Sequence, residues 1–364
     1  MKSLSTILAS ALLACSVMVQ ADQATKSPEV EVEEEKSGLF DSKLGVIPAP
    51  VIDDVLGNGV QLMVMYLHDK AEGARDPSTT FAFGQYTDSD SSVIILGHEH
   101  VFAHDEWRAS LVAGRFDLNM DYHGPVGSRL PSAVKYASNG NFIFSEVRKK
   151  IVDNLYFGVQ GIWSSNKANL KADATDAERN AFEDALTGSS TAGGFLVTYD
   201  TRDNGMAARQ GVNVDVRSMH YTDDKTDKPY HRLEAEFSQY FAITESNTIA
   251  YRLITEHLVG NVPGGEFVSP ELRGVNWNKY RGTSVYQGEI ELRHQFNPKW
   301  AGVAFAGLAH VEHKEIADSG RMTPAAGIGI RYLIDPVERF SIGADIAVDK
   351  DGHNTFYLRF GEAF

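Results

Sequence analysis

Two short motifs in this sequence combine charged side chains with glycine, and the first of them ends a predicted strand. It consists of Asp200, Arg202, Asp203 and Asn204, and Gly211 begins the strand that follows. Carboxylate and amide side chains cap the backbone amides of tight turns, and carboxylates also pair with guanidinium groups. The motif therefore predicts a rigid turn between two strands rather than a catalytic site.

The second motif is Leu272-Arg273-Gly274, which lies in a long predicted loop at 261–283. Glycine lets the backbone turn sharply, and an arginine beside it can fold back into an aqueous lumen and pair with a carboxylate there. Three carboxylates on later predicted strands are candidate partners, namely Glu289, Glu291 and Asp345. The motif therefore predicts an arginine that is held inside a lumen.

Residues for catalysis or cofactor binding form no recognisable pattern elsewhere. The sequence has no serine elbow, glycine-rich phosphate loop or paired-cysteine motif. His98 and His100 place two imidazoles on one strand face, but two histidines without a third ligand are typical of a wet surface rather than of a metal site. We therefore predict no catalytic residue, no cofactor and no metal site.

The N-terminus has the pattern of a secretory signal peptide. Lys2 precedes an apolar stretch at 4–19, and the small residue Ala21 marks a cleavage site. We therefore predict a signal peptide at 1–21 that is removed on export. The alternative is a lipoprotein signal with Cys15 as the lipidated residue. Because Cys15 is the single cysteine, cleavage after Ala21 leaves no thiol for a disulfide.

Residues 22–44 are acidic and contain little that a core could bury. The stretch 29–36 alone carries five glutamates, which predicts a disordered leader rather than a folded domain. The whole chain has a net charge of -15. Binding to nucleic acid requires clustered lysine and arginine, so this charge argues against a nucleic-acid partner.

From residue 45 to the C-terminus, apolar and polar residues alternate in segments of about ten residues. At 284–297, for example, apolar residues alternate with Glu289, Glu291 and Arg293. A charged row on one face suits a water-filled lumen, and an apolar row on the other suits lipid. No apolar run beyond the signal reaches the roughly 18 to 20 residues that a spanning helix needs. We therefore predict an all-β fold, a transmembrane antiparallel β-barrel at 45–364.

Fifteen strand candidates are recognisable in this region. They are 59–68, 78–87, 91–103, 106–122, 139–149, 153–165, 191–202, 210–222, 230–242, 247–260, 284–297, 299–312, 321–334, 337–350 and 354–364. A bacterial single-chain barrel has an even number of strands, so we predict sixteen, with the remaining one at about 40–55. Short turns are expected to face the periplasm and long loops the exterior. The segment 173–186 predicts a short helix in one of those loops.

The chain ends on an aromatic residue in the last predicted strand. Four apolar residues share one register there, interrupted by Glu362; they are Phe356, Leu358, Phe360 and Phe364. An apolar row of this kind is expected to face lipid. We expect the strand 354–364 to close against the first strand as a lateral seam.

These features resemble the BamA/TamA family of outer-membrane assembly and translocation barrels, also called the bacterial surface antigen family. The resemblance covers most of 45–364 and depends on the turn motif at 199–204, the loop tip at 272–274, the strand at 327–332, Asp345 and the terminus at 360–364. It implies sixteen strands, with the arginine loop between the eleventh and the twelfth.

Three features depart from the family pattern. About two dozen residues separate the predicted signal from the barrel, so we expect no periplasmic polypeptide-transport domains. The proline that is usual after the turn motif is missing at 205–209. Gly307 stands near the position of the aspartate that often pairs with the loop arginine, so either Arg273 finds another partner or the loop is not locked in the lumen.

The resemblance implies a role in the assembly or translocation of a protein or lipid at the outer membrane of a Gram-negative cell. One alternative is a passive pore or surface antigen, and a minor one is a hydrolase at the rim; an enzyme is not our expectation. We expect a monomer that contacts outer-membrane lipids and a protein or lipid substrate.

Overall fold

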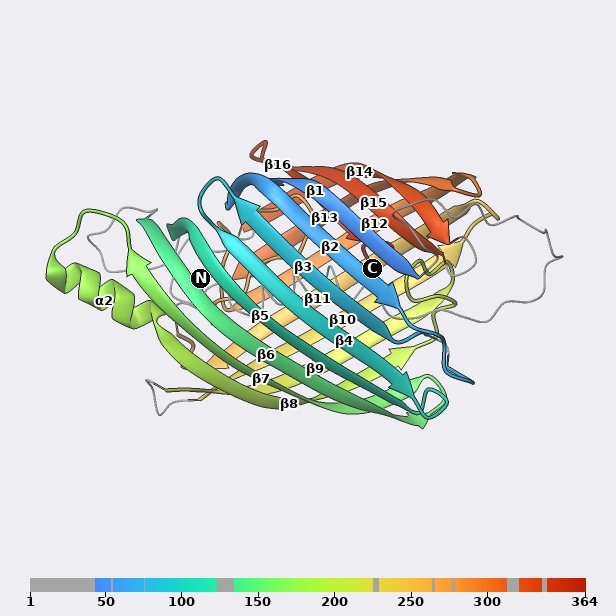
Figure 1. Ribbon diagram of the computed structural model, residues 1–364, viewed down its shortest axis with the longest axis horizontal. Helices are drawn as coiled ribbons and strands as arrows, with labels where there is room; N and C mark the ends of the chain where they lie inside the picture. Colours follow the sequence, from blue (N-terminus) through green and yellow to red (C-terminus); the bar gives the residue numbers. More distant parts are fainter. Residues whose placement is uncertain are drawn as a thin grey trace.

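Sixteen antiparallel strands form one continuous sheet that curls into a barrel (Figure 1). The computed structural model describes residues 43–53, 55–74, 76–122, 134–224, 229–263, 266–276, 279–312, 321–335 and 339–364. The strands are β1 (Leu44–Asp53), β2 (Gly57–Leu67), β3 (Thr79–Thr87), β4 (Ser92–Phe102), β5 (Trp107–Tyr122), β6 (Val134–Val152), β7 (Leu155–Leu170), β8 (Gly188–Asp200), β9 (Gly211–Asp223), β10 (Tyr230–Ala242), β11 (Asn247–Gly260), β12 (Ser284–Asn297), β13 (Trp300–Glu312), β14 (Arg321–Asp335), β15 (Phe340–Asp349) and β16 (Asn354–Phe360). The predicted sixteen-stranded transmembrane β-barrel is confirmed.

All fifteen recognised strand candidates are strands, and the sixteenth is β1, inside the range 40–55. The clearest differences in bounds are at β6, which begins five residues earlier than predicted, at β7, which ends at Leu170 rather than at residue 165, and at β16, which ends at Phe360 rather than at residue 364. The predicted signal peptide at 1–21 lies outside the described residues. The same holds for the acidic leader at 22–44 as far as residue 42.

The start of β1 and the end of β16 lie at the same rim of the barrel, because the chain crosses the barrel an even number of times between them. We call this rim, where β1 begins and β16 ends, the terminal rim, and the opposite one the loop rim. The long connections at 171–187 and 261–283 lie at the loop rim. The first contains α2 (Asp176–Leu186), which a capping box at Thr175 begins, within the segment where a helix is predicted. Among the described residues, no helix is long and apolar enough to cross a membrane.

Each strand separates an outward row from a lumen-facing row; the lumen-facing row is largely polar in β9 to β12 and apolar in β1, β2 and β4. In β12, Tyr286, Ile290 and Leu292 are 41%, 52% and 47% exposed, whereas Glu289 and Glu291 are 5% and 0% exposed. The alternation predicted for this segment is therefore confirmed. Because the polar row faces inward, the lumen is lined with charged groups that neighbouring strands hold close together.

The seam between β1 and β16 lacks the hydrogen-bond ladder that joins the other neighbouring strands. Among the described residues, ladders run from each strand to the next, and none joins β16 back to β1, although the two lie side by side (Figure 1). Leu67 N donates to Lys43 O (2.8 Å), so the odd-numbered residues of β1 form the hydrogen-bonded pairs with β2. Pro48 and Pro50 therefore turn their nitrogen atoms toward the seam, where neither can donate.

Apolar packing joins the terminal end of the seam instead. Phe360 is 2% exposed and its ring stacks on Phe340, with 5.3 Å between centroids. A methyl group at Gly45 of β1 would overlap the Phe360 ring. The prediction that Phe360 faces lipid is therefore wrong, because its ring packs against β1 and the start of β15. Phe356 and Leu358, earlier in the strand, are partly exposed.

Candidate functional site

The tip of the loop between β11 and β12 lies inside the barrel and places Arg273 among three carboxylates. Arg273 is 3% exposed. Its Nε donates to Glu289 Oε1 (2.6 Å), its Nη2 to Glu291 Oε2 (2.5 Å) and its Nη1 to Asp345 Oδ2 (2.9 Å). The guanidinium also lies over the Phe305 ring, 3.5 Å from its centroid. The structure thus brings all three candidate partners to the arginine.

Further charged groups extend this contact into a network of four arginines and four carboxylates. The lumen charge network consists of Arg273, Glu289, Glu291, Arg293, Arg331, Asp345, Arg359 and Glu362. Arg293 Nε donates to Glu291 Oε1 (2.6 Å). Arg331 joins Asp345 Oδ1 (2.5 Å) to Glu362 Oε2 (2.7 Å). Because the opposite charges balance, the loss of one group would leave a partner uncompensated in a buried site.

The loop tip also contacts the seam strand. Gly274 N donates to the hydroxyl of Tyr357 on β16 (2.8 Å). Gly274 has a φ of 90°, and a methyl group there would crowd two alanines of neighbouring strands, so the position requires glycine. Arg273 binds Asp345 of β15, the neighbour of β16. The loop therefore braces the last hairpin of the barrel from the lumen side.

Gly307 shows why the arginine uses these partners. A β-carbon at Gly307 would overlap the side chain of Leu272, which is 3% exposed. The position on β13 therefore leaves room for the leucine of the loop tip and supplies no carboxylate to Arg273. The guanidinium reaches β12 and β15 instead.

The Asp200 motif builds the turn between β8 and β9 at the terminal rim. Asp200 Oδ1 accepts hydrogen bonds from the backbone N and the Nε of Arg202 (3.0 and 3.1 Å). Asn204 Oδ1 accepts from two backbone amides of the turn (2.9 and 2.8 Å), and Asp203 Oδ1 from two more (2.8 and 3.0 Å). Gly211 has a φ of 104°, and a β-carbon there would overlap a carbonyl of the turn. These contacts are those of a rigid turn.

Residues 361–364, which we call the C-terminal tail, leave β16 and dock on this turn. The departure begins at Gly361, whose φ is 66°. Glu362 N donates to Met206 O (2.9 Å). Arg293 joins the turn to the tail. Its Nη1 donates to Ala208 O in the turn (2.9 Å), and its Nη2 donates to Phe364 O in the tail (2.7 Å). The tail therefore links the seam strand to the far side of the barrel.

Phe364 itself lies in the lumen and not toward lipid, so its predicted place in the lipid-facing row is wrong. It is 7% exposed. Its ring lies 6.3 Å from that of Tyr240, centroid to centroid, and the guanidinium of Arg252 lies 5.1 Å from the Phe364 centroid. Tyr240 and Arg252 belong to the lumen faces of β10 and β11. The register of β16 does not extend to residue 364 because the strand ends before Gly361.

Sequence reasoning missed a second group of lumen charges on the opposite wall. Arg217 Nε donates to Asp215 Oδ1 (2.9 Å) within β9, and Arg148 Nη1 lies 3.5 Å from Asp215 Oδ2. Arg148 also pairs with Glu146, two residues earlier in β6. Opposite charges two residues apart in a predicted strand share one face, and that spacing is the signal that could have identified them.

Two groups of potential metal ligands have other partners. His98 and His100 lie on the outward face, where Thr80 and Ser78 bond them (2.8 and 3.2 Å). Among the described residues, three close ligands occur together only at 349–353, in the turn between β15 and β16. Asp351 of that turn already accepts hydrogen bonds from the arginine loop.

Asp351 joins this turn to the arginine loop. Lys279 Nζ and the Tyr280 hydroxyl each donate to Asp351 Oδ2 (2.6 Å), and these hydrogen bonds lower the pKa of Asp351 to about 2. A lowered carboxyl pKa means that the contact is complete above the ordinary value of 3.8 and is lost as the pH falls through about 2. We expect Lys279→Gln to raise the titration midpoint of Asp351 toward 3.8 in carboxyl ¹³C NMR. The distant Lys299→Gln should leave it unchanged, and an equal midpoint in all three proteins would contradict the contact.

The nearly closed sheet and the charged, loop-filled lumen define a class, the sixteen-stranded transmembrane β-barrel. In structure the chain is similar to BamA from Haemophilus ducreyi lacking POTRA domains 1-3, with a TM-score of 0.52, 12% identity and coverage of 98% of this chain and 77% of that one. It is also similar to CdiB from Acinetobacter baumannii (TM-score 0.56, 10% identity, 87% of this chain and 58% of that one). CdiB from Escherichia coli has the same TM-score and identity, and the match covers 87% of this chain and 62% of that one.

These similarities confirm the BamA/TamA-like barrel fold that the motifs predict. No protein-family model and no curated protein sequence matches the chain. The chain spans about six tenths of the CdiB chains. Similarity at 10–12% identity establishes the fold alone.

Proposed function

We propose that this chain, exported by the signal peptide at 1–21, is an outer-membrane barrel of a Gram-negative cell that assembles or passes a protein or lipid through the seam. The observation that supports this most directly is the unladdered edge between β1 and β16. Parting two strands of a closed ladder breaks a row of backbone hydrogen bonds, each worth about 0.5–1.5 kcal/mol net. At this seam Pro48 and Pro50 remove two donors, so the cost of parting is smaller.

The interior of the barrel favours this role over that of a passive pore. The loop tip crosses the lumen from one rim, and the C-terminal tail docks across the terminal rim. Both attach to the last hairpin, the loop through Gly274 and Asp345 and the tail through its own backbone. Movement of the seam strand would therefore be coupled to the contents of the lumen. Large, steady conductance of the native protein in planar bilayers would instead identify a passive pore.

Hydrogen exchange at the seam edge tests the proposal. Gly361 N donates to Ser341 O (2.8 Å), so the amides of Phe356 and Leu358 point to the seam and not to β15. We expect these two amides to exchange much faster than those of Tyr357 and Arg359 in the same strand. Similar protection of all four would mean that the seam is laddered.

A seam variant extends the test to the cell. Pro48→Val with Pro50→Val restores two donors, so it should slow exchange of the Phe356 and Leu358 amides and impair the opening of the seam. Cells that lack the gene should show an altered protein or lipid composition of the outer membrane. The native chain should restore it, and the double variant should not. Full rescue by a variant with a slowed seam would count against the lateral route.

A further inference from the structure

Four histidines face outward near the loop rim on one side of the barrel, and we infer that they bind phosphate groups of membrane lipids. This outer histidine row consists of His220, His231, His257 and His310, on β9, β10, β11 and β13. Each alternates along its strand with a buried, lumen-facing neighbour, such as Met219 beside His220 or Arg232 beside His231. The rings therefore point to the surface that contacts lipid in a transmembrane barrel.

The rings of the row are held in place by one another and by hydroxyl groups. His220 Nδ1 and His231 Nε2 are 3.3 Å apart, in residues that pair directly across β9 and β10. His257 contacts Thr255 Oγ1 through Nε2 (2.9 Å) and Ser284 Oγ through Nδ1 (3.1 Å). An imidazole or hydroxyl can donate a hydrogen bond to a phosphate oxygen. These contacts use both ring nitrogens of His257, so the donors that the row presents to a ligand are a remaining ring nitrogen of the His220–His231 pair and the hydroxyl groups of Thr255 and Ser284.

Tyr286 continues the row between two of its members. Its ring lies 5.1 Å from that of His257 and 6.3 Å from that of His310, centroid to centroid. The carboxylate that faces the row on its own strands is Glu312, 3.2 Å from His310 Nε2. Aromatic rings with a polar edge are typical of the level at which lipid headgroups meet the hydrocarbon. The row therefore lies where a headgroup is expected.

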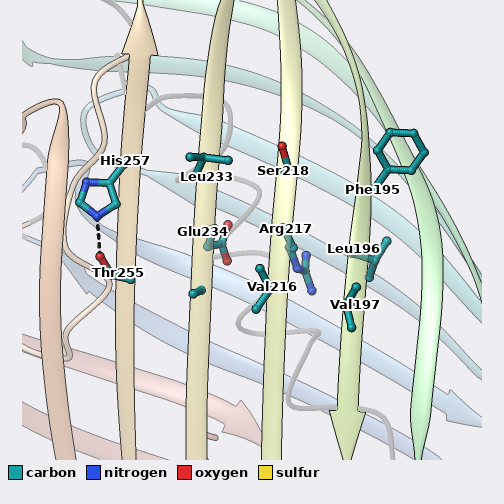
Figure 2. A pocket seen from close by; sticks show the side chains of 11 residues that line it. Phe195, Leu196, Val197, Val216, Arg217, Ser218, Leu233, Glu234, Thr255 and His257 are labelled. Carbon is teal, nitrogen blue, oxygen red and sulfur yellow. Dashed lines mark hydrogen bonds between the residues drawn. The ribbon is translucent and has the colours of Figure 1, made fainter.

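Two apolar grooves on the outward wall lead away from the row. The first has a volume of about 340 Å³, and Figure 2 shows Phe195, Val216 and Leu233 lining it, with His257 bonded to Thr255 at one end. The second, of about 580 Å³, is lined among others by Leu253 and carries His310 at its margin. Both grooves are hydrophobic slots open to the side that contacts lipid, which suits an acyl chain.

Small side chains create these grooves. Ala235 lines both of them, and it pairs with Val216 on one side and Thr255 on the other. Gly288 lines the second groove, where a β-carbon would come within 3.0 Å of the Leu253 side chain. Larger residues beside Ala235 form the walls. A groove with an imidazole at one end matches the two parts of a lipid, a chain and a phosphate.

The occupant that fits this surface is a lipid of the leaflet at the loop rim that carries an exposed phosphomonoester. A phosphomonoester offers more negative charge and more acceptor oxygens than a phosphodiester does, and several neighbouring donors can bind it together. The row lies on β9 to β13, away from β1 and β16. A negative result for lipid binding would therefore leave the proposed lateral passage unaffected, and a negative result at the seam would leave the lipid site unaffected.

Native mass spectrometry of the intact barrel tests the site with two lipids that have the same chains. Dioleoyl phosphatidic acid exposes a phosphomonoester, and dioleoyl phosphatidylcholine does not. We expect the first to bind about tenfold more tightly. Replacing the row, with His220→Gln, His231→Gln, His257→Gln and His310→Gln together, should remove this preference. Equal binding of the two lipids by the native barrel would overturn the inference.

A matched control changes four outward histidines near the terminal rim. The variant combines His68→Gln, His98→Gln, His100→Gln and His294→Gln. This control should keep the preference for phosphatidic acid. If it loses the preference as fully as the row variant does, any outward histidine has the same effect, and the inference is overturned. Ala235→Phe fills the grooves and should weaken binding of both lipids. Unchanged binding of both would overturn the role of the grooves.

Discussion

Removal of residues 361–364 should raise the conductance of the purified barrel in planar bilayers several-fold and make it steady. The tail occupies the lumen at the terminal rim, where Phe364 is 7% exposed against β10 and β11. Its removal leaves Arg331 and Arg293 without two of their partners, Glu362 and the last carbonyl. A buried charge without a partner draws in water, so the mouth of the lumen should hydrate and conduct.

Two point variants separate loss of the tail from general damage to the barrel. Phe364→Ala removes the ring and should give a smaller increase in conductance than the deletion. Phe296→Ala removes an outward phenylalanine that is 61% exposed near the same rim, and it should leave the conductance unchanged. If the deletion protein folds, as judged by its β-sheet circular dichroism, and conducts no better than the native one, the tail does not close the lumen.

The strands whose alternation is clearest in the sequence are those whose two faces meet different solvents. β12 has lipid on one side and charged lumen on the other, so its alternation is visible in the sequence. β1 shows no such contrast, because Ile47, Ala49 and Val51 face the lumen and are apolar too. Its prolines also argue against a central strand. Its location followed from the even strand number and not from its own pattern.

The end of β16 was mispredicted because a periodic pattern was extended across a glycine. Phe364 falls in the register of Phe356, Leu358 and Phe360, but Gly361 adopts a left-handed conformation that turns the chain inward. Glu362 is the signal that could have shown this. A carboxylate in an outward row would lie in hydrocarbon at a cost of several kcal/mol, whereas in the lumen it meets Arg331.

The sequence limits the candidate partners of Arg273 to a few carboxylates, but it does not reveal the charge network around them. Glu289, Glu291 and Asp345 were recognisable because they are acidic residues on predicted lumen faces. The curvature of the barrel and the position of the loop decide which arginines reach these carboxylates across the lumen. Neither leaves a periodic trace in the chain, so the links through Arg331 and Arg293 emerge only from the structure.

Arg273→Ala should release the loop and loosen the seam. The change leaves Glu289, Glu291 and Asp345 close together in a buried site without their shared counter-charge. Breaking a buried ion pair by removing one partner costs about 3–5 kcal/mol. Because the loop tip also holds Tyr357 through Gly274, the seam amides of β16 should exchange faster than in the native protein. Slower chemical unfolding than native, or unchanged exchange, would count against the brace.

Comparison with conservative and peripheral variants decides whether the effect depends on the guanidinium. Arg273→Lys keeps the charge but cannot reach three carboxylates at once, so it should fall between the native protein and the alanine variant. Lys279→Gln breaks an exposed pair in the same loop, and such pairs are worth about 0–1 kcal/mol. In cells that lack the gene, the native chain and Lys279→Gln should restore the outer membrane and Arg273→Ala should not. Such a ranking would show that the loop acts on the seam strand through Arg273.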